Sequence, residues 1–230
     1  MKKLGLIGGI GPESTLLYYH DIVYGVQEKC GLDMFPHLTI ESVNVYEVLR
    51  LCTEKKYEEL TAYLLGAIQN LKNSGADFAA ISANTPHIVF GRLQERSPLP
   101  LVSIVEATRE EALRRGLHKI GLLGTIITMT GEFFKAPFAG SGVDIVTPTA
   151  EEMDLVNLRI ASELEKGIVK EETLREFQQV IERMRNEDGI EAVVLGCTEI
   201  PLLLNDEVSP VPCLDTVKIH VESLVEKILE

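Results

Sequence analysis

Two short stretches of the sequence carry residues that could do acid–base chemistry. In VLGCTEIP, Cys197 directly follows an apolar run that predicts a buried strand. A thiol at the start of the next helix meets unpaired backbone amides and the positive end of the helix dipole, which favour the thiolate and lower the cysteine pKa. We therefore predict that Cys197 is a nucleophile or a base. The alternative is a small buried hydrophobic residue.

The second stretch, SANTPH, ends another apolar run. Its pattern predicts that Thr85 is the N-cap of a helix and that Pro86 is the first helical residue. A turn of this kind exposes amides and a hydroxyl that can bind a carboxylate. Asn84, Thr85 and, in the first stretch, Thr198 are therefore candidate ligand-binding residues, although Thr85 could simply cap its helix. His87 could orient a neighbouring group or donate a hydrogen bond, or it could be structural.

The segments around these stretches predict an α/β fold. Short apolar runs alternate with amphipathic helical patterns, which is typical of parallel sheets covered by helices. The predicted strands lie in KLGLIGG, HLTIESV, FAAIS, LVSIV, KIGLLGT, VDIVTPT, AVVLGCT and VPCLD. The predicted helices cover residues 57–73, 104–115, 151–166 and 173–187.

The two halves of the sequence resemble each other. GADFAAISANTPH aligns without a gap on GIEAVVLGCTEIP, and KLGLIGG aligns on KIGLLGT. We infer a duplication of one lobe, although two unrelated strand–helix units could match by chance. The predicted fold is two similar lobes, each a parallel sheet flanked by helices, related by a pseudo-twofold axis with the active site in the cleft between them. In this alignment Ala83 lies over Cys197.

The length, the apolar runs and the net charge of the chain argue against several classes of partner. The 230 residues suit one large α/β domain or two lobes, and no apolar run approaches the ~20 residues of a membrane span. The net charge of −13 argues against nucleic acid and acidic membranes as partners, because phosphates require clustered Lys and Arg. The apolar stretch in MKKLGLIGGIGPEST breaks at glycines before signal-peptide length, so we expect a cytoplasmic protein with a small-molecule partner.

Neither the cysteines nor the glycine-rich segment predicts a cofactor site. The four cysteines show no zinc or disulfide spacing, which predicts reduced thiols and no metal. Cys30, Cys52 and Cys213 lack the setting of Cys197 and are expected to be packing residues. GLIGGIGPEST fits neither the GxGxxG dinucleotide fingerprint nor a phosphate loop with its lysine. We interpret it as a tight turn around Ile10 that lets a substrate approach the backbone.

Three motifs in order, GLIGGIGPEST, ANTPH and GCTEIP, make the chain similar to the aspartate/glutamate racemase superfamily, particularly its amino-acid racemase branch. The resemblance covers nearly the whole chain. It implies two similar α/β lobes with the active site between them and an acidic amino acid such as aspartate or glutamate as substrate. It also implies no pyridoxal phosphate, no metal and a homodimer.

In that family two thiols flank the substrate α-carbon; one removes a proton, and the other returns one from the opposite face. By this resemblance Cys197 is the second thiol, and Ala83 stands where the first would be. The ligand-binding residues named above, or backbone amides, would stabilise the carbanion, and Glu199 also fits the amino-acid racemases. Because one positioned acid or base contributes about 10²–10⁴-fold, racemisation is expected to be impaired or one-sided.

Several explanations of Ala83 are open. The alanine could be an engineered change that silences the enzyme, or a natural one with water or Ser82 as a weaker acid. Strand alternation directs Ser82 to the face opposite Ala83, which favours water. The chain could also be a one-cysteine decarboxylase of the same superfamily, in which decarboxylation generates the carbanion, or a catalytically inactive amino-acid-binding protein.

Recognition of the substrate's side-chain carboxylate requires a cation. The resemblance places the nearest candidates at Arg50 and Lys166, with solvated surface charges as the alternative, and Cys52 in the same region as Arg50 could contact the ligand. The fold of the family also implies that the last helix returns to the first lobe. The predicted lobes are residues 1–100 with 212–230, and residues 101–211.

Overall fold

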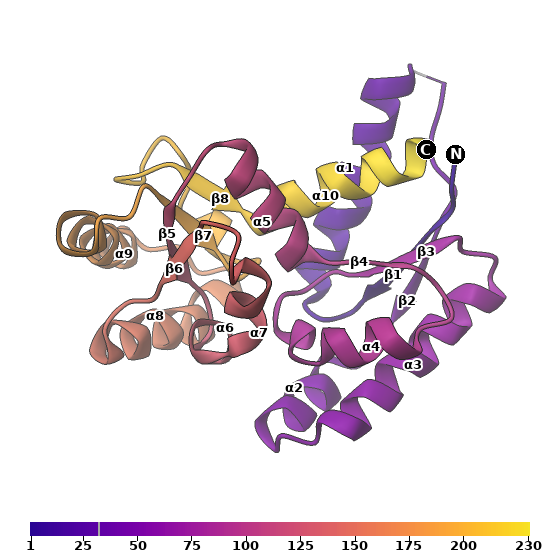
Figure 1. Cartoon of the computed structure of the whole chain (residues 1–230), viewed down its shortest axis with the longest axis horizontal. Coiled ribbons are helices and arrows are strands. Elements are labelled where there is room, and N and C mark those ends of the chain that lie inside the picture. Colours follow the sequence, from indigo (N-terminus) through magenta and orange to yellow (C-terminus); the bar gives the residue numbers. More distant parts are fainter. Residues whose placement is uncertain (32) are drawn as a thin grey trace. The chain divides into compact units, whose positions relative to one another are not determined.

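The chain forms two compact units (Figure 1). The computed structural model describes residues 1–31 and 33–230. The first unit contains Met1–Ala107 and Val217–Glu230, and the second contains Thr108–Thr216. These units divide the chain a few residues after the predicted boundaries. Among the described helices, none combines the length and the apolar character that a membrane crossing requires.

The first unit contains a four-stranded parallel sheet in the order β2-β1-β3-β4. Its strands are β1 (Leu4–Gly8), β2 (Leu38–Ser42), β3 (Phe78–Ile81) and β4 (Leu101–Val102). Its helices are α1 (Pro12–Cys30), α2 (Val45–Thr53), α3 (Tyr57–Asn73), the 3-10 helix η1 (Thr85–Val89), α4 (Phe90–Arg96), the start of α5 (Ile104–Arg114) and nearly all of α10 (Thr216–Leu229).

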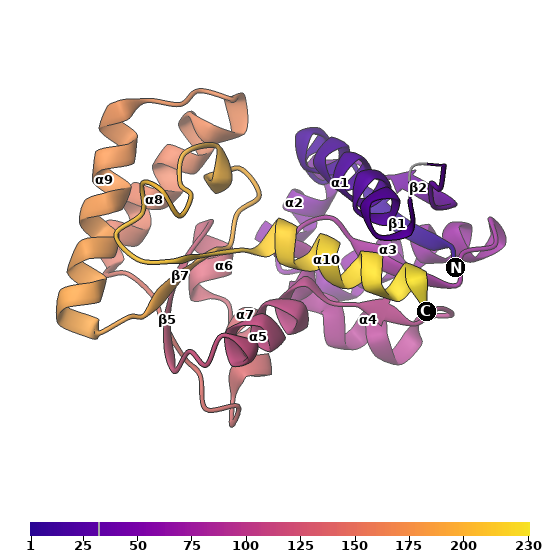
Figure 2. The same cartoon turned by 90° about the horizontal axis from the view of Figure 1, so that it is seen from above.

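Helices cover both faces of this sheet. α1 and α10 lie side by side over one face (Figures 1 and 2), where Tyr18 of α1 and Leu224 of α10 belong to one buried cluster with residues of β1 and β3. α2, α3 and α4 lie on the other side (Figure 1). Here Gly5 of β1 leaves room for α3, since a Cβ at Gly5 would come within 2.9 Å of Leu71. Burial on both faces explains why the central strands are apolar throughout.

The second unit contains a parallel sheet in the order β6-β5-β7-β8. Its strands are β5 (Lys119–Leu123), β6 (Asp144–Val146), β7 (Ala192–Leu195) and β8 (Cys213–Asp215). Its helices are α6 (Ile126–Thr130), α7 (Glu132–Lys135), η2 (Ala136–Phe138), α8 (Ala150–Ser162), η3 (Leu164–Lys166), α9 (Glu171–Arg183) with a following π-helical turn (Met184–Asp188), and η5 (Ile200–Leu202).

Both sheets have the same strand order, because β5 to β8 take the places of β1 to β4. Ser82 and Gly196, the residues that follow β3 and β7, each donate their backbone N–H to the neighbouring central strand, at 3.0 and 2.7 Å. Ala83 and Cys197 are the next residues in the two units, and each lies two residues after the end of its strand. The predicted pair of parallel sheets flanked by helices is therefore confirmed, while the pseudo-twofold axis and the shared cleft stay predictions.

One predicted helix is shorter than its apolar pattern. α8 ends at Ser162, before the predicted residue 166, because Glu163 leaves the helical conformation with φ −126° and ψ −65°. Its buried carboxylate accepts hydrogen bonds from Arg159 Nη1 (2.9 Å), Lys170 Nζ (3.0 Å) and Thr173 Oγ1 (2.5 Å). A buried charge needs such partners, and two of them, Lys170 and Thr173, lie in the segment after the helix, toward which the chain turns at Glu163.

Candidate functional site

The turn after β7 places a thiol beside a carboxylate. Cys197 Sγ donates to Glu199 Oε2 at 2.9 Å, and Thr198 Oγ1 donates to the same oxygen at 2.8 Å. The Cys197 side chain is 8% exposed, so its surroundings are largely protein. A proton can pass directly between the sulfur and the carboxylate in this arrangement, which is the geometry that general acid–base catalysis requires.

The predicted lowering of the Cys197 pKa is wrong. The helix expected to follow the thiol is only the three-residue η5, which has too few aligned peptides to act as a helix dipole. Burial instead raises the pKa of Cys197 well above its ordinary value, and the negative charge of Glu199 raises it further. Both effects favour the protonated thiol, so Cys197 must give its proton to a base before it can remove a proton from a substrate.

The turn after β3 differs by one residue from its prediction. Asn84, with φ −78° and ψ −49°, precedes η1 as its N-cap, and its side chain makes no capping hydrogen bond; Thr85 is the first residue of the helix. Pro86 follows within the first turn. Because Asn84 already has helical torsions, the turn begins one residue earlier than a Thr85 cap would allow. Ala83 is 6% exposed and Thr85 is half-buried.

The Ser82 hydroxyl takes part in the sheet. It donates to the carbonyl oxygen of Ile7 at 3.0 Å, and the side chain is fully buried. The hydroxyl of Ser14 in turn donates to the carbonyl oxygen of Ser82 at 2.8 Å. The proton of Ser82 is thus directed at β1, which makes Ser82 a poor substitute for a missing acid at Ala83.

His87 is buried and neutral. Its Nδ1 donates to the carbonyl oxygen of Ala83 at 3.0 Å, and its Nε2 accepts from the backbone N–H of Ile104 at 3.4 Å. The ring stacks on Phe90 with 4.8 Å between the centroids. Burial lowers the pKa of His87 to about 4. His87 therefore contacts the backbone at Ala83, and its predicted supporting role in the site stays a prediction.

A second buried histidine, His220 of α10, was missed by the sequence analysis. His220 Nδ1 accepts from the Tyr18 hydroxyl at 2.8 Å, and Nε2 donates to the carbonyl oxygen of Val102 at 3.3 Å. Burial, and then the neighbouring His87, lower the pKa of His220 to about 3. The apolar periodicity of α10 could have revealed it, because His220 lies next to Val221 and one turn before Leu224 on the buried face.

Acid should destabilise the fold through these two histidines. In the unfolded chain both have a pKa of about 6.5, so below that pH the unfolded chain binds more protons than the folded chain and stability falls. At pH 5 we expect a loss of about 2 kcal/mol for each histidine, relative to neutral pH. Urea unfolding at pH 7 and pH 5 measures this loss, and His220→Gln should remove about half of it. Equal free energies of unfolding at both pH values would contradict the buried neutral state.

The predicted cations lie in different settings. The guanidinium of Arg50 forms ion pairs with Glu47 and Glu54, each at 2.7 Å, so two carboxylates already neutralise it. Lys166 is exposed at the end of η3, beside Glu165. Partial desolvation, followed by the charge of Glu199, raises the pKa of Glu165. The η3 segment therefore lies within electrostatic reach of the Cys197 turn.

The remaining predicted residues are buried near the ends of strands or within helices. Cys52 lies in α2, and burial raises its pKa to about 11, as expected for a packing thiol. Ile10 is buried between Gly9 and Gly11, whose φ values of +77° and +75° are left-handed. A Cβ at Gly9 would overlap the carbonyl oxygen of Val43, which explains why this tight turn requires glycine.

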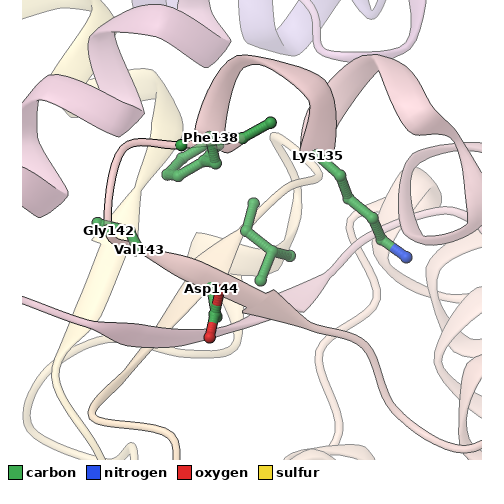
Figure 3. A pocket seen from close by; sticks show the side chains of 8 residues that line it. Lys135, Phe138, Gly142, Val143 and Asp144 are labelled. Carbon is green, nitrogen blue, oxygen red and sulfur yellow. The ribbon is translucent and has the colours of Figure 1, made fainter.

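A cavity of about 500 Å³ in the second unit lies at the amino-terminal end of strand β6. It is lined by Lys135, Phe138, Ala139, Gly140, Gly142, Val143, Asp144 and Ile145 (Figure 3). Asp144 begins β6, whereas Cys197 follows the carboxyl end of the parallel strand β7. The cavity is therefore not part of the candidate site. Nowhere in the described chain do three or more His, Cys, Asp or Glu residues form a group that could hold a metal ion.

Comparison with known proteins gives consistent matches over the whole chain. The family model described as Asp/Glu/Hydantoin racemase matches residues 7–224. The broad specificity amino-acid racemase RacX of Bacillus subtilis (strain 168) is 23% identical over 223 residues, which cover 93% of this chain and 92% of RacX. Among solved structures, an aspartate racemase homologue from Pyrococcus horikoshii OT3 is 38% identical with a TM-score of 0.88, and a Yersinia pestis protein is 33% identical with a TM-score of 0.93. Both structural matches cover 100% of each chain.

Proposed function

Because the chain belongs to the Asp/Glu/hydantoin racemase family, we propose that it is a cofactor-independent amino-acid racemase that acts on aspartate or glutamate. Cys197 is the proposed acid and base, and Ala83 makes the reaction impaired or one-sided. The observation that supports this proposal most directly is the 2.9 Å hydrogen bond from the Cys197 thiol to Glu199. It pairs the one candidate thiol with a group that can accept and return its proton.

The proposed reaction begins with proton transfer from Cys197 to Glu199, which leaves a thiolate and a carboxylic acid. The thiolate removes the α-proton of the amino acid, and the electron pair of the C–H bond moves into the α-carboxylate to form an enediolate. Hydrogen bonds from Asn84 and Thr85 would stabilise this charge as it develops, while the Thr198 hydroxyl stays bound to Glu199. Return of the proton from the Cys197 thiol to the same face restores the starting enantiomer.

Inversion requires a proton from the opposite face. Ala83 occupies the equivalent position after β3 but carries only a methyl group. Water is the proposed donor there, because the hydroxyl of Ser82 is bound to Ile7. We therefore expect exchange of the α-proton to be much faster than racemisation.

An acidic side chain on the substrate requires a cation in the site. Lys166 is the better of the two candidates, because Arg50 is already paired with two glutamates. The aspartate racemase homologue at 38% identity is consistent with an acidic amino acid as substrate. A homodimer, expected from the family resemblance, stays a prediction.

The second candidate function is a one-cysteine decarboxylase. One observation favours it, since a protonated Cys197 with no partner thiol is suited to protonate a carbanion that forms by loss of CO₂. In that case the substrate is a malonate-like diacid. A decarboxylase of this kind is expected not to exchange the α-proton of an amino acid.

Proton NMR in D₂O tests the two functions together. L- and D-aspartate, L- and D-glutamate and a substituted malonate are incubated separately with the protein. Loss of the Hα signal from one enantiomer of an amino acid, with slower loss of optical purity, is the expected result. Release of CO₂ from the malonate without amino-acid exchange would contradict the racemase. Thermal stabilisation by an amino acid without any exchange would indicate a binding protein instead.

A further inference from the structure

The two peptide carbonyls that flank the α-carbon of Ala83 are both held by buried side chains. Ser14, in the first turn of α1, donates its hydroxyl to the carbonyl oxygen of Ser82 at 2.8 Å, across a sequence separation of 68 residues. His87 donates Nδ1–H to the carbonyl oxygen of Ala83 at 3.0 Å. Both donors are almost completely buried. Water competes weakly for such bonds, so they hold the backbone in one orientation.

Fixing these carbonyls also fixes the amides on their far sides. In a planar trans peptide the C=O and the N–H point in opposite directions. The bond from Ser14 to Ser82 therefore determines where the N–H of Ala83 points. The bond from His87 to Ala83 likewise determines the direction of the N–H of Asn84. Since the planes on both sides of the Ala83 α-carbon are held, the direction of its Cβ is determined as well.

Ser14 and His87 are themselves held by neighbours. Gly9 N–H donates to Thr15 Oγ1 at 2.9 Å, and Thr15 Oγ1 donates to the carbonyl of Gly11 at 3.0 Å, so the start of α1 is tied to the end of β1. His87 is fixed by its stacking on Phe90 and by the N–H of Ile104. A reacting group needs this kind of support from a surrounding layer of contacts, because small displacements lower the rate strongly.

We propose that Ser14 and His87 are positioning residues that fix the backbone of residue 83 for proton transfer. The inference rests on the proposed function. It adds that residue 83 contributes through its backbone, since its side chain is not reactive. In the proposed reaction the backbone N–H of residue 83, whose direction these bonds fix, donates to the substrate carboxylate as charge develops in the enediolate. The same two residues would aim the sulfur of a cysteine introduced at this position.

A pair of Ser14 variants tests the proposal against a matched control. Ser14→Ala removes the hydroxyl, and Ser14→Thr keeps it. Thr61 is an equally buried hydroxyl in α3 that donates to the carbonyl of Tyr57 at 2.7 Å within its own helix, so Thr61→Val removes a comparable bond away from the turn. For each variant, kcat and KM for α-proton exchange in D₂O are measured with the thermal midpoint.

We expect Ser14→Ala to lower kcat by roughly 10–100-fold, because a peptide group in another direction no longer orients the substrate correctly in the transition state. Ser14→Thr should recover most of this loss, and Thr61→Val should lower the thermal midpoint without a comparable effect on kcat. His87→Phe keeps the ring but removes the donor, and it should also lower kcat. His87→Gln retains an N–H donor and should recover part of the activity.

Two results would overturn the proposal in distinguishable ways. Wild-type exchange together with equal kcat losses in Ser14→Ala and Thr61→Val would show that the Ser14 bond only stabilises the fold, and the proposed function would stand. Absence of exchange in the wild type and in Ala83→Cys would contradict the proposed function, and the positioning role would fail with it. If Ser14→Ala does not fold, the comparison of His87→Phe with His87→Gln decides in the same way.

Discussion

Replacing Ala83 with cysteine is expected to raise the racemisation rate of aspartate or glutamate by about 10²–10⁴-fold, the usual contribution of one positioned acid or base. Ala83 follows β3 at the position that Cys197 occupies after β7, in sheets with the same strand order. In the proposed reaction, a thiol at position 83 supplies the second proton that inversion requires. Chiral chromatography gives the racemisation rate, and NMR in D₂O gives the exchange rate. The ratio of the two rates should approach one in this variant.

The control for this gain is Ala83→Ser. Serine has nearly the size of cysteine, but its hydroxyl is a far weaker acid, so racemisation should stay near the wild-type rate. A combined Ala83→Cys, Cys197→Ala variant should exchange the enantiomer that the wild type exchanges poorly. Equal racemisation by Ala83→Ser and Ala83→Cys would show that the added side chain acts through packing rather than through a thiol.

Replacing Cys197 with alanine should lower the α-proton exchange rate by about 10²–10⁴-fold, because the variant loses its only proposed base. The turns proposed to bind the substrate are left in place. The carboxylate of Glu199 remains bound to the Thr198 hydroxyl at 2.8 Å. The exchange rate in D₂O, measured at substrate concentrations above KM, reports this loss directly.

Cys213→Ala provides the matched control for Cys197→Ala. Cys213 is a buried thiol of β8 in the same unit, and burial raises its pKa also. Both variants should lose a similar amount of stability through the cavity left by sulfur, and only Cys197→Ala should lose exchange. Exchange that persists in Cys197→Ala would remove this residue from the reaction and leave the racemase proposal without its acid and base.

The sequence predicted the elements of the fold well because their signals are local. All eight predicted strands are present, and α3 has the predicted bounds of Tyr57–Asn73. Apolar runs and helical periodicity depend on residues within a few turns or strands of one another, so they can be read without the tertiary fold. The internal alignment also placed Ala83 and Cys197 at equivalent positions, because a duplicated strand order preserves register.

Several properties of the candidate site depended on contacts that no local pattern contains. The pKa of Cys197 is raised by burial and by Glu199, whereas the helix that should have lowered it is the short η5. Likewise, the family resemblance made Arg50 a candidate cation for the substrate, and its ion pairs with Glu47 and Glu54 depend on side-chain conformations along α2. Desolvation and ion pairing are set by the whole surroundings of a group, so periodicity does not predict them.

The sequence by itself determined the alternation of strands and helices, the repeated unit and the identity of the one thiol that follows a buried strand. Only the tertiary structure decided that this thiol is protonated and bound to Glu199, and that Ser14 and His87 hold the backbone at Ala83. The reason is physical: burial patterns repeat along the chain and can be read from it. Proton affinity and backbone orientation instead depend on groups that only folding brings together, such as Ser14 and Ser82 across 68 residues.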